Sequence, residues 1–311
     1  MRIIIELPTW LGDCVMCSPA IINILKAYPN SEIIFIGSNM TIALFERHPN
    51  FYKSFTYHKK YLDVFFLSKK LGNADIFFSF RSSIRSTFLK FLVKSKSKFQ
   101  FNKKFYAHGH QVEKYNNFVN HSLNTEYKPG KLKLFNQKKD IDKALPKKYI
   151  GINPGASYGS AKCWELESYA DVAKELSNEY PIVILGGEKE ALVAEKLELL
   201  FKRLNITNYL NLCGKTSIDE LISIIGKMEI LITGDSGTMH IAGAMEIKII
   251  ALFGPTKSYE TSVWKAKHYK IIKKNLDCQP CMKRECPLLH NNCMRLIKPK
   301  EVLAAISEIR D

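Results

Sequence analysis

The chain alternates between short apolar runs and longer segments in which apolar residues recur every three or four positions. Apolar runs of this length predict strands, and the three-to-four spacing predicts amphipathic helices. In the first half the pattern predicts strands at 2–7, 32–37, 52–57 and 74–79, and helices at 15–28, 39–47, 61–70 and 84–93. Strands that alternate with helices favour a parallel sheet with helices on both faces.

The same order returns after a polar, basic stretch. Residues 94–140 have weaker periodicity, with a loop predicted at 106–110 and a helix at 111–120, and residues 138–148 are the best linker candidate. The second half predicts strands at 149–152, 182–186, 209–212, 230–233 and 248–253, and helices at 166–178, 189–201, 217–227, 238–244 and 299–310. We therefore expect an α/β protein with two Rossmann-like, doubly wound domains, residues 1–145 and 146–311.

Charge separates the two halves. The net charge of the 311 residues is 46 − 30 = +16. Residues 1–145 hold 23 basic and 10 acidic residues, a net of +13, and residues 146–311 hold 23 and 20, a net of +3. A field of this sign attracts nucleic acid, an anionic membrane or an acidic substrate. A lysine-rich proteome would produce part of the same bias.

Neither a signal peptide nor a membrane span is predicted. The first apolar run contains Glu6 and is followed by Asp13, and no window approaches the roughly 18 apolar residues that a span needs. We therefore expect a cytoplasmic protein.

Four of the eight cysteines form a cluster near the carboxyl end. Cys278, Cys281, Cys286 and Cys293 have the spacing C-x2-C-x4-C-x6-C, with His290 nearby. Four soft ligands at this spacing are compatible with a structural zinc, and reduced thiols are the alternative. The other four cysteines lie in or beside apolar elements, where reduced core or loop thiols are expected.

The most informative segment is residues 230–256. An apolar strand runs into the turn G-D-S-G at 234–237, a small-residue helix begins with T-M-H at 238–240, and the next strand ends in G-P-T at 254–256. Ligands of doubly wound folds bind at the carboxyl ends of such strands, and the start of a helix favours a phosphate. An ordinary turn without a substrate is the alternative.

Three other segments place polar residues just after predicted strands. W-L-G-D at 10–13 brings Asp13 to the exit of the first strand, where a simple helix cap is the alternative role. The segment 151–164 contains Lys162 shortly before a tryptophan, and I-V-I-L-G-G-E at 182–188 ends in Glu188. A solvated loop lysine and a common surface acid are the alternatives for these two residues.

In their order and spacing, these four segments resemble the bacterial lipopolysaccharide heptosyltransferases, and the resemblance covers nearly the whole chain. It implies the GT-B architecture, with two Rossmann-like domains facing a central cleft. The first domain would bind the acceptor and the second the nucleotide sugar ADP-heptose, and the C-terminal helix would pack back on the first. The implied reaction is an inverting transfer that needs no cofactor or metal, with Asp13 as the base.

The resemblance also implies a set of donor-binding residues. Lys162 would contact a phosphate, Glu188 the adenosine ribose, Asp235 the sugar hydroxyls and His240 the donor. The whole implied set is Ser157, Lys162, Glu188, Asp235, Ser236, Gly237, Thr238 and His240. Capping by Asp235 and a buried structural role for His240 are the alternatives.

Arg81 and Arg85 follow the strand at 74–79 and lie four residues apart, which predicts that they share one helical face. They suit a carboxylated, phosphorylated acceptor such as Kdo–lipid A, and a solvated basic pair is the alternative.

The cysteine segment resembles the branch of the family that adds the second inner-core heptose. We therefore expect Kdo–lipid A bearing one heptose as the acceptor; a different core acceptor, as in the branch that adds the first heptose, is the alternative. We also expect the anionic face of the inner membrane as a partner and no nucleic acid.

Nucleic-acid binding is the rival function. It is favoured by four aromatic residues that lie among the basic ones: Phe99, Phe101, Phe105 and Tyr106.

Overall fold

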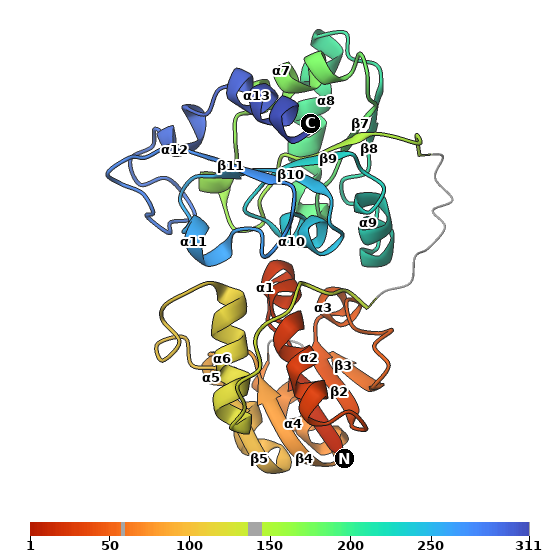
Figure 1. Cartoon of the computed structure of the whole chain (residues 1–311), viewed down its shortest axis with the longest axis vertical. Coiled ribbons are helices and arrows are strands. Elements are labelled where there is room, and N and C mark those ends of the chain that lie inside the picture. The colour runs from red at the N-terminus through yellow and green to blue at the C-terminus, as the bar shows by residue number, and fades with distance from the viewer. Residues whose placement is uncertain (57–59, 136–144, 311) are drawn as a thin grey trace. The chain divides into compact units, whose positions relative to one another are not determined.

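The computed structural model describes residues 1–56, 60–135 and 145–310, and the chain divides into two compact units, Met1–Gln137 and Lys138–Asp311 (Figure 1). Part of the predicted linker, residues 138–144, lies outside the described residues. The elements of the first unit are β1 Arg2–Glu6, α1 Leu11–Met16, α2 Ser18–Ala27, β2 Glu32–Gly37, α3 Asn39–Ile42, β3 Phe51–Thr56, α4 Tyr61–Leu71, β4 Asn73–Ser79, α5 Ile84–Leu92, β5 Lys94–Gln100 and α6 Gln111–Leu123.

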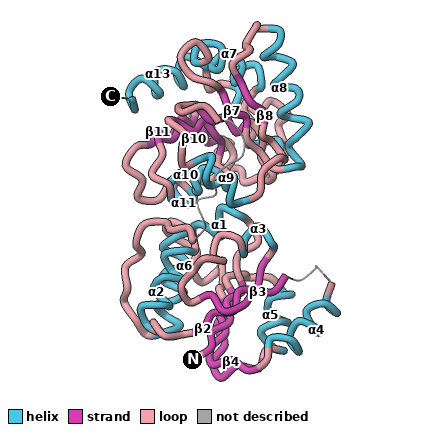
Figure 2. The backbone as a smooth tube through the Cα atoms, turned by 90° about the vertical axis from the view of Figure 1, so that its right-hand side faces the viewer, coloured by secondary structure: helices cyan, strands magenta, loops and turns pink. Residues whose placement is uncertain are grey.

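The first unit is built on a parallel sheet with the strand order β3-β2-β1-β4-β5. Its central strand is buried on both faces, which explains the continuous apolar run at Ile3, Ile4 and Ile5. The helices α4 and α5 pack on one face through Val64 and Leu89. The helices α2 and α6 lie together on the other face (Figure 2).

Two predictions for this unit were wrong. The sequence predicted no strand at residues 94–100, where the structure has β5, an edge strand with the sequence KSKSKFQ. Lysines are typical of edge strands because they discourage pairing with other chains, and they also remove the apolar signal of a strand. The predicted helix 15–28 is two helices that meet at Cys17, and Pro19 lies in the first turn of the second.

The second unit contains a parallel sheet with the order β11-β10-β9-β6-β7-β8. Its elements are β6 Ile150–Asn153, the short 3₁₀ helix η1 Ser160–Lys162, α7 Leu166–Leu176, β7 Ile182–Ile184, the 3₁₀ helix η2 Glu188–Glu190, α8 Ala191–Arg203, β8 Tyr209–Asn211, α9 Ile218–Ile225, β9 Ile230–Gly234, α10 Gly237–Ala244, β10 Lys248–Phe253, α11 Ser258–Thr261, β11 Tyr269–Lys273, α12 Asn292–Arg295 and α13 Pro299–Arg310. The edge strand β11 was not predicted.

Helices cover both faces of the second sheet. The helices α7, α8 and α13 share one apolar core with the strands, and α9 and α10 lie on the opposite side (Figure 1). The C-terminal helix α13 uses its apolar face within this unit, against α7, β10 and β11. The indole Nε1 of Trp164 donates a hydrogen bond to the Ile297 carbonyl oxygen at 2.9 Å and ties the chain before α13 to the core. Packing of this helix on the first half stays a prediction.

All neighbouring strands run parallel, so the loops that follow them gather at the carboxyl edge of each sheet. In the first unit this edge carries the segment after β1, with Asp13, and the segment after β4, with Arg81 and Arg85. In the second unit it carries the segments after β6, β7 and β9. These two edges hold the predicted site residues.

Candidate active site

The turn between β9 and α10 presents the start of a helix at the carboxyl edge of the second sheet. Ser236 is the N-cap, and its hydroxyl accepts a hydrogen bond from the Met239 backbone N–H at 3.4 Å. The other N–H groups of the first turn have no partner within a helix, so they favour an anion there. The predicted residues Ser236, Gly237 and Thr238 all lie in this turn.

A network of short hydrogen bonds fixes the turn. The hydroxyl of Ser236 lies 2.8 Å from that of Thr233 and 2.7 Å from that of Thr238. The side-chain amide of Asn153, at the end of β6, donates to the Thr238 hydroxyl at 2.7 Å. Asn153 and Thr233 were not predicted as site residues. Because the network crosses between β6 and β9, it holds the helix start in one geometry before any ligand binds.

The predicted phosphate-binding lysine is paired with the predicted sugar-binding acid. The Lys162 Nζ lies 2.7 Å from the Asp235 Oδ2 and donates to the Asp235 carbonyl oxygen at 2.9 Å. Both side chains are largely buried, with 11% and 8% of their surface exposed. An ammonium group has three N–H donors, and these contacts occupy two of them. The third donor has no oxygen partner among these contacts, and the ammonium group also lies 4.7 Å from the centre of the Tyr158 ring.

The loop after β7 is organised by Glu190. Its carboxylate accepts hydrogen bonds from the Gly187 N–H at 2.7 Å and from the Ser157 hydroxyl at 3.0 Å. The predicted Glu188 begins η2 and packs against Gly214. The sequence analysis selected Glu188, and the structure shows that Glu190, two residues later, links this loop to the loop after β6.

His240 lies in α10, where only 2% of its surface is exposed. It follows the helix start by three residues and is therefore part of the same turn and helix as Ser236 and Thr238. A direct contact between this side chain and a donor stays a prediction.

At the carboxyl edge of the first sheet, Asp13 lies in the first turn of α1. The N-cap of this helix is Trp10 and no side chain caps it, so Asp13 is not the capping residue. Burial raises the pKa of the Tyr115 hydroxyl and of the Cys17 thiol, and the negative charge of Asp13 adds to both shifts. Asp13 therefore sits close to two groups that stay protonated at neutral pH.

The two predicted acceptor arginines have different surroundings. Arg81 precedes the N-cap Ser83 of α5, so it does not share a helical face with Arg85, and that prediction was wrong. The Arg81 Nε donates to the Leu7 carbonyl oxygen at 2.6 Å and lies 3.8 Å from the fully buried carboxylate of Glu6. Arg81 is thus the counter-ion of a buried acid. Arg85 lies in the first turn of α5, and its buried Nε has no hydrogen-bond partner within the described residues.

The clustered cysteines line one small, apolar cavity together with His290. Burial raises the pKa of the Cys293 thiol to about 11, and the three other clustered thiols contribute to the shift. Across residues 1–56, 60–135 and 145–310, no three His, Cys, Asp or Glu side chains are arranged to hold a metal ion. A structural zinc at this cluster stays a prediction without geometric support.

Comparison with known proteins identifies the family. The model of glycosyltransferase family 9 (heptosyltransferase) matches residues 64–291. The chain is 39% identical to lipooligosaccharide heptosyltransferase 2 of Campylobacter jejuni subsp. jejuni serotype O:6, over 99% of both chains. It is also 39% identical to the protein of the same name from serotype O:2, over 97% of this chain and 96% of the relative.

Solved structures share the fold. The structure of E. coli ADP-heptose lipopolysaccharide heptosyltransferase II matches with a TM-score of 0.81 and 20% identity, over 99% of this chain and 98% of the other. At this identity the likeness is one of fold. It confirms the predicted GT-B architecture of two parallel, helix-covered sheets.

Proposed function

The chain belongs to glycosyltransferase family 9, the heptosyltransferases, and from this premise we propose how its residues perform the transfer. It is a glycosyltransferase that adds heptose during assembly of the lipopolysaccharide core, with ADP-heptose as donor. The rival function of nucleic-acid binding is not favoured. We propose that the transfer inverts the anomeric centre and that the acceptor is the first heptose of the inner core.

The donor diphosphate would bind at the start of α10. The turn supplies backbone N–H groups and the helix dipole, and the third N–H of Lys162 supplies a charge-assisted hydrogen bond. The observation that carries this role is the buried pair of Lys162 and Asp235, because it aims an ammonium group at the helix start. As the bond from the sugar to the phosphate breaks, these groups stabilise the charge that develops on ADP.

Asp13 would be the base. In a single displacement, the acceptor hydroxyl oxygen attacks the anomeric carbon of the donor heptose and the ADP oxygen leaves with the bonding electron pair. The hydroxyl proton passes to the Asp13 carboxylate. Its place on α1, at the carboxyl edge of the first sheet, supports this role. Tyr115 and Cys17 beside it stay protonated, so they do not compete for the proton.

Arg85 would bind an acidic group of the acceptor. A guanidinium group forms bidentate hydrogen bonds with carboxylates and phosphates, and Kdo–lipid A carries both. The Nε of Arg85 is enclosed by protein and has no partner within the described part of the chain, so an acceptor oxygen would bind the outer N–H groups of the guanidinium instead. Arg81 would act on the acceptor only indirectly, because Glu6 and Leu7 already hold its guanidinium group.

The first unit would dock on the anionic, cytoplasmic face of the inner membrane. Twelve basic residues lie between positions 59 and 104, of which Lys59 is outside the described residues. No described helix is long and apolar enough to cross a bilayer. A peripheral position held by charge is therefore the form of membrane attachment that we propose, at about 1 kcal/mol for each basic residue near an anionic surface.

Apolar side chains on α4 and α5 support this docking. The inner face of α4 packs on the sheet through Val64 and Leu67, but its outer face is also apolar, with Leu62, Phe65 and Phe66 exposed. These outer residues are spaced as one helical face, and Lys69 continues it. On α5, Ile84 and Phe91 are about four-fifths exposed. Exposed apolar patches of this kind mark interaction surfaces.

This surface combines aromatic and basic residues, the combination that interfacial helices use. The Lys69 Nζ lies 5.2 Å from the centre of the Phe65 ring. The rings of Tyr61 and Phe88, 5.5 Å apart, join α4 to α5. Both helices begin at the carboxyl edge that carries Asp13 and Arg85, so a lipid-anchored acceptor would reach that edge from the membrane.

A thermal-shift measurement tests the donor role. ADP present at a hundred times its dissociation constant should stabilise the protein by about 2.7 kcal/mol, which raises the melting temperature by several degrees. Single-stranded nucleic acid of the same phosphate concentration should have no such effect. Equal shifts with both ligands would mean that the basic surface, and not the α10 turn, binds phosphate.

A further inference from the structure

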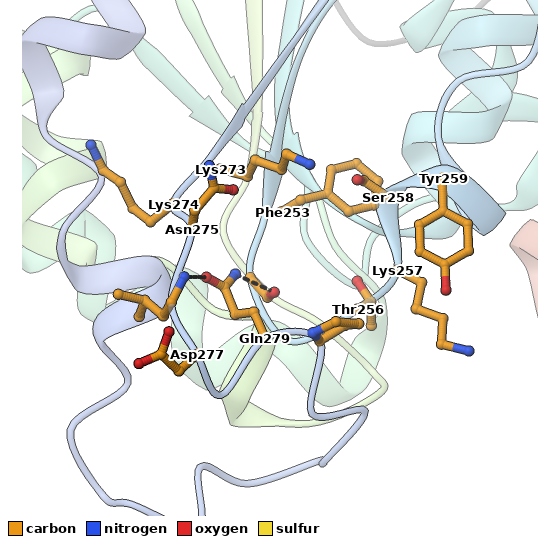
Figure 3. Close-up of a pocket in the computed structure, with 13 residues that line it drawn as sticks. Phe253, Thr256, Lys257, Ser258, Tyr259, Lys273, Lys274, Asn275, Asp277 and Gln279 are labelled. Atoms are coloured by element: carbon orange, nitrogen blue, oxygen red, sulfur yellow. Dashed lines mark hydrogen bonds between the residues drawn. The ribbon is translucent and has the colours of Figure 1, made fainter.

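A further cavity lies at the carboxyl edge of the second sheet (Figure 3). It is formed where β10 and β11 end, at Phe253 and Lys273, which are in register. Its volume is about 300 Å³, at the lower end of the range of roughly 300–1,000 Å³ for small-molecule sites. This size suits one sugar unit rather than a whole oligosaccharide.

The position of the cavity places it within reach of a donor or its acceptor. The strand β10 lies between β9, which leads into the Asp235 turn, and β11. Neighbouring strands are about 4.8 Å apart, so one or two strand spacings separate the cavity from the helix start of α10. That span is comparable to the length of one sugar ring with its substituents.

The walls of the cavity are held together by side-chain and backbone hydrogen bonds. The Gln279 Nε2 donates to the Gly254 carbonyl oxygen at 2.7 Å, and its Oε1 accepts from the Leu276 N–H at 3.1 Å. The first bond connects the segment after β11 to the segment after β10, and the second closes a turn within the segment after β11, as Figure 3 shows. The Met282 N–H also donates to the Pro255 carbonyl oxygen at 2.9 Å. The cavity is therefore preformed.

One polar group in the lining lacks a partner. Thr256 is 7% exposed, and its hydroxyl oxygen forms no hydrogen bond in the described part of the chain. Leaving a buried hydroxyl unsatisfied is costly, and such groups in native proteins call for an explanation. Rotation of the Thr256 side chain about χ1 would bring this hydroxyl to a ligand hydroxyl in the cavity.

The remaining polar lining offers both donors and acceptors. Lys273 supplies an ammonium group, Asp277 a carboxylate, and Ser258 and Asn275 supply groups of both kinds. Two further lysines of the lining are already neutralised: Lys257 pairs with Glu260 at 2.9 Å and Lys274 with Glu301 at 2.6 Å. The lining is thus balanced in charge, which favours a neutral group rich in hydroxyls over a phosphate.

From this geometry we propose that the cavity between the ends of β10 and β11 is a monosaccharide subsite that binds one heptose unit through Thr256, Lys273 and Asp277. The assignment rests on the proposed function, which supplies the sugar. Two sources have the chemistry that the cavity recognises, the heptosyl group of the donor and the heptose of the acceptor. No atom of the subsite takes part in bond breaking.

The test replaces Thr256 by Val and Lys273 by Met, which remove the two hydrogen-bonding groups and keep their approximate size. Calorimetry gives the affinities for ADP and for ADP-heptose, and steady-state kinetics give the KM for the heptosylated acceptor. The variant Thr256→Ser keeps the hydroxyl and should behave as the parent. The control Lys270→Met changes a lysine of the same strand outside the cavity.

We expect the double variant to weaken sugar binding by about 10-fold, the size of one or two lost hydrogen bonds. If the donor heptose occupies the subsite, the affinity for ADP-heptose falls while that for ADP is unchanged. If the acceptor heptose occupies it, both nucleotide affinities are unchanged and the acceptor KM rises.

Two results would overturn the subsite: no change in any of the three constants in the folded double variant, or an equal loss of ADP and ADP-heptose affinity. Failure of the proposed function has a separate signature. In that case the parent protein itself would bind neither ADP nor ADP-heptose.

Discussion

Both units of this protein have a parallel sheet with site residues at its carboxyl edge, but the contacts among those residues differ between the two edges. In the second unit, the hydroxyls of Thr233, Ser236 and Thr238 and the pair of Lys162 with Asp235 converge on one helix start. In the first unit, Arg81 is the counter-ion of the buried Glu6, and Asp13 and Arg85 lie on separate helices. A preorganised edge suits one invariant ligand such as a diphosphate. An edge with few preformed contacts suits an acceptor that a charged membrane surface would also hold in place.

Charge follows the same division. The first half carries +13 and the second +3, and the exposed apolar residues of α4 and α5 lie on the basic half. We propose that catalysis and membrane docking belong to the first unit and donor binding to the second. Substitutions on the two edges should therefore affect different constants.

The largest effect is expected at Asp13. Asp13→Asn removes the base but keeps the size of the side chain, so turnover should fall by about 10²–10⁴-fold while ADP affinity is unchanged. Steady-state kinetics and calorimetry check this, with Asp219→Asn, a first-turn acid of α9, as the matched control. Near-normal turnover of folded Asp13→Asn would remove Asp13 from the mechanism.

Lys162 should control donor affinity. Lys162→Met should weaken ADP binding by about 1.5–3 kcal/mol, the contribution of a hydrogen bond to a charged group. It also leaves the Asp235 carboxylate buried without its partner, so the free energy of unfolding should fall by several kcal/mol.

Combining this change with Asp235→Asn separates the two effects of Lys162→Met. The double variant should regain stability but not ADP affinity. If calorimetry finds full ADP affinity in Lys162→Met or in the double variant, Lys162 forms the ion pair with Asp235 but does not bind ADP.

The outer face of α4 should control membrane binding. Phe65→Ser with Phe66→Ser should reduce binding to anionic vesicles about 10-fold or more, because two exposed rings no longer enter the interface. Co-sedimentation measures it, with Leu192→Ser and Leu199→Ser, exposed residues of α8 in the other unit, as the control.

Salt should weaken the vesicle binding of the parent protein as the Debye length falls from about 10 Å at 0.1 M to about 3 Å at 1 M. Neutral vesicles should bind little at either salt concentration. If neither salt nor the phenylalanine substitutions change vesicle binding, the positive charge of the first half is only a compositional bias and does not dock the protein on a membrane.

The smallest predicted effect is at Arg85. Arg85→Glu should raise the acceptor KM about 10-fold and leave ADP affinity unchanged, with Lys90→Glu later in the same helix as control. Arg81→Glu should instead destabilise the first unit, because it places a second carboxylate beside Glu6. An unchanged acceptor KM in Arg85→Glu would show that this residue does not contact the acceptor.

The sequence predicted the alternation of central strands and helices, because those elements carry a strong periodic pattern. It missed β5, whose alternating lysines remove that pattern, and the short edge strand β11, whose sequence is YKIIK. The turn between β9 and α10 was predictable because its residues are contiguous.

Contacts between distant segments were not predictable. Lys162 and Asp235 are 73 residues apart, and nothing local indicated that they form a pair. The same holds for the Glu6 partner of Arg81, for the hydrogen bond between Ser157 and Glu190, and for the cavity between β10 and β11.

The most direct test of the central claim is a transfer reaction followed by mass spectrometry. The purified protein is incubated with ADP-heptose and Kdo–lipid A that bears one heptose, and in parallel with Kdo–lipid A that bears none. The proposed function predicts that only the heptosylated acceptor gains one heptosyl unit, with release of one equivalent of ADP. Transfer to the heptose-free acceptor alone, or ADP release without a glycosylated product, would contradict it.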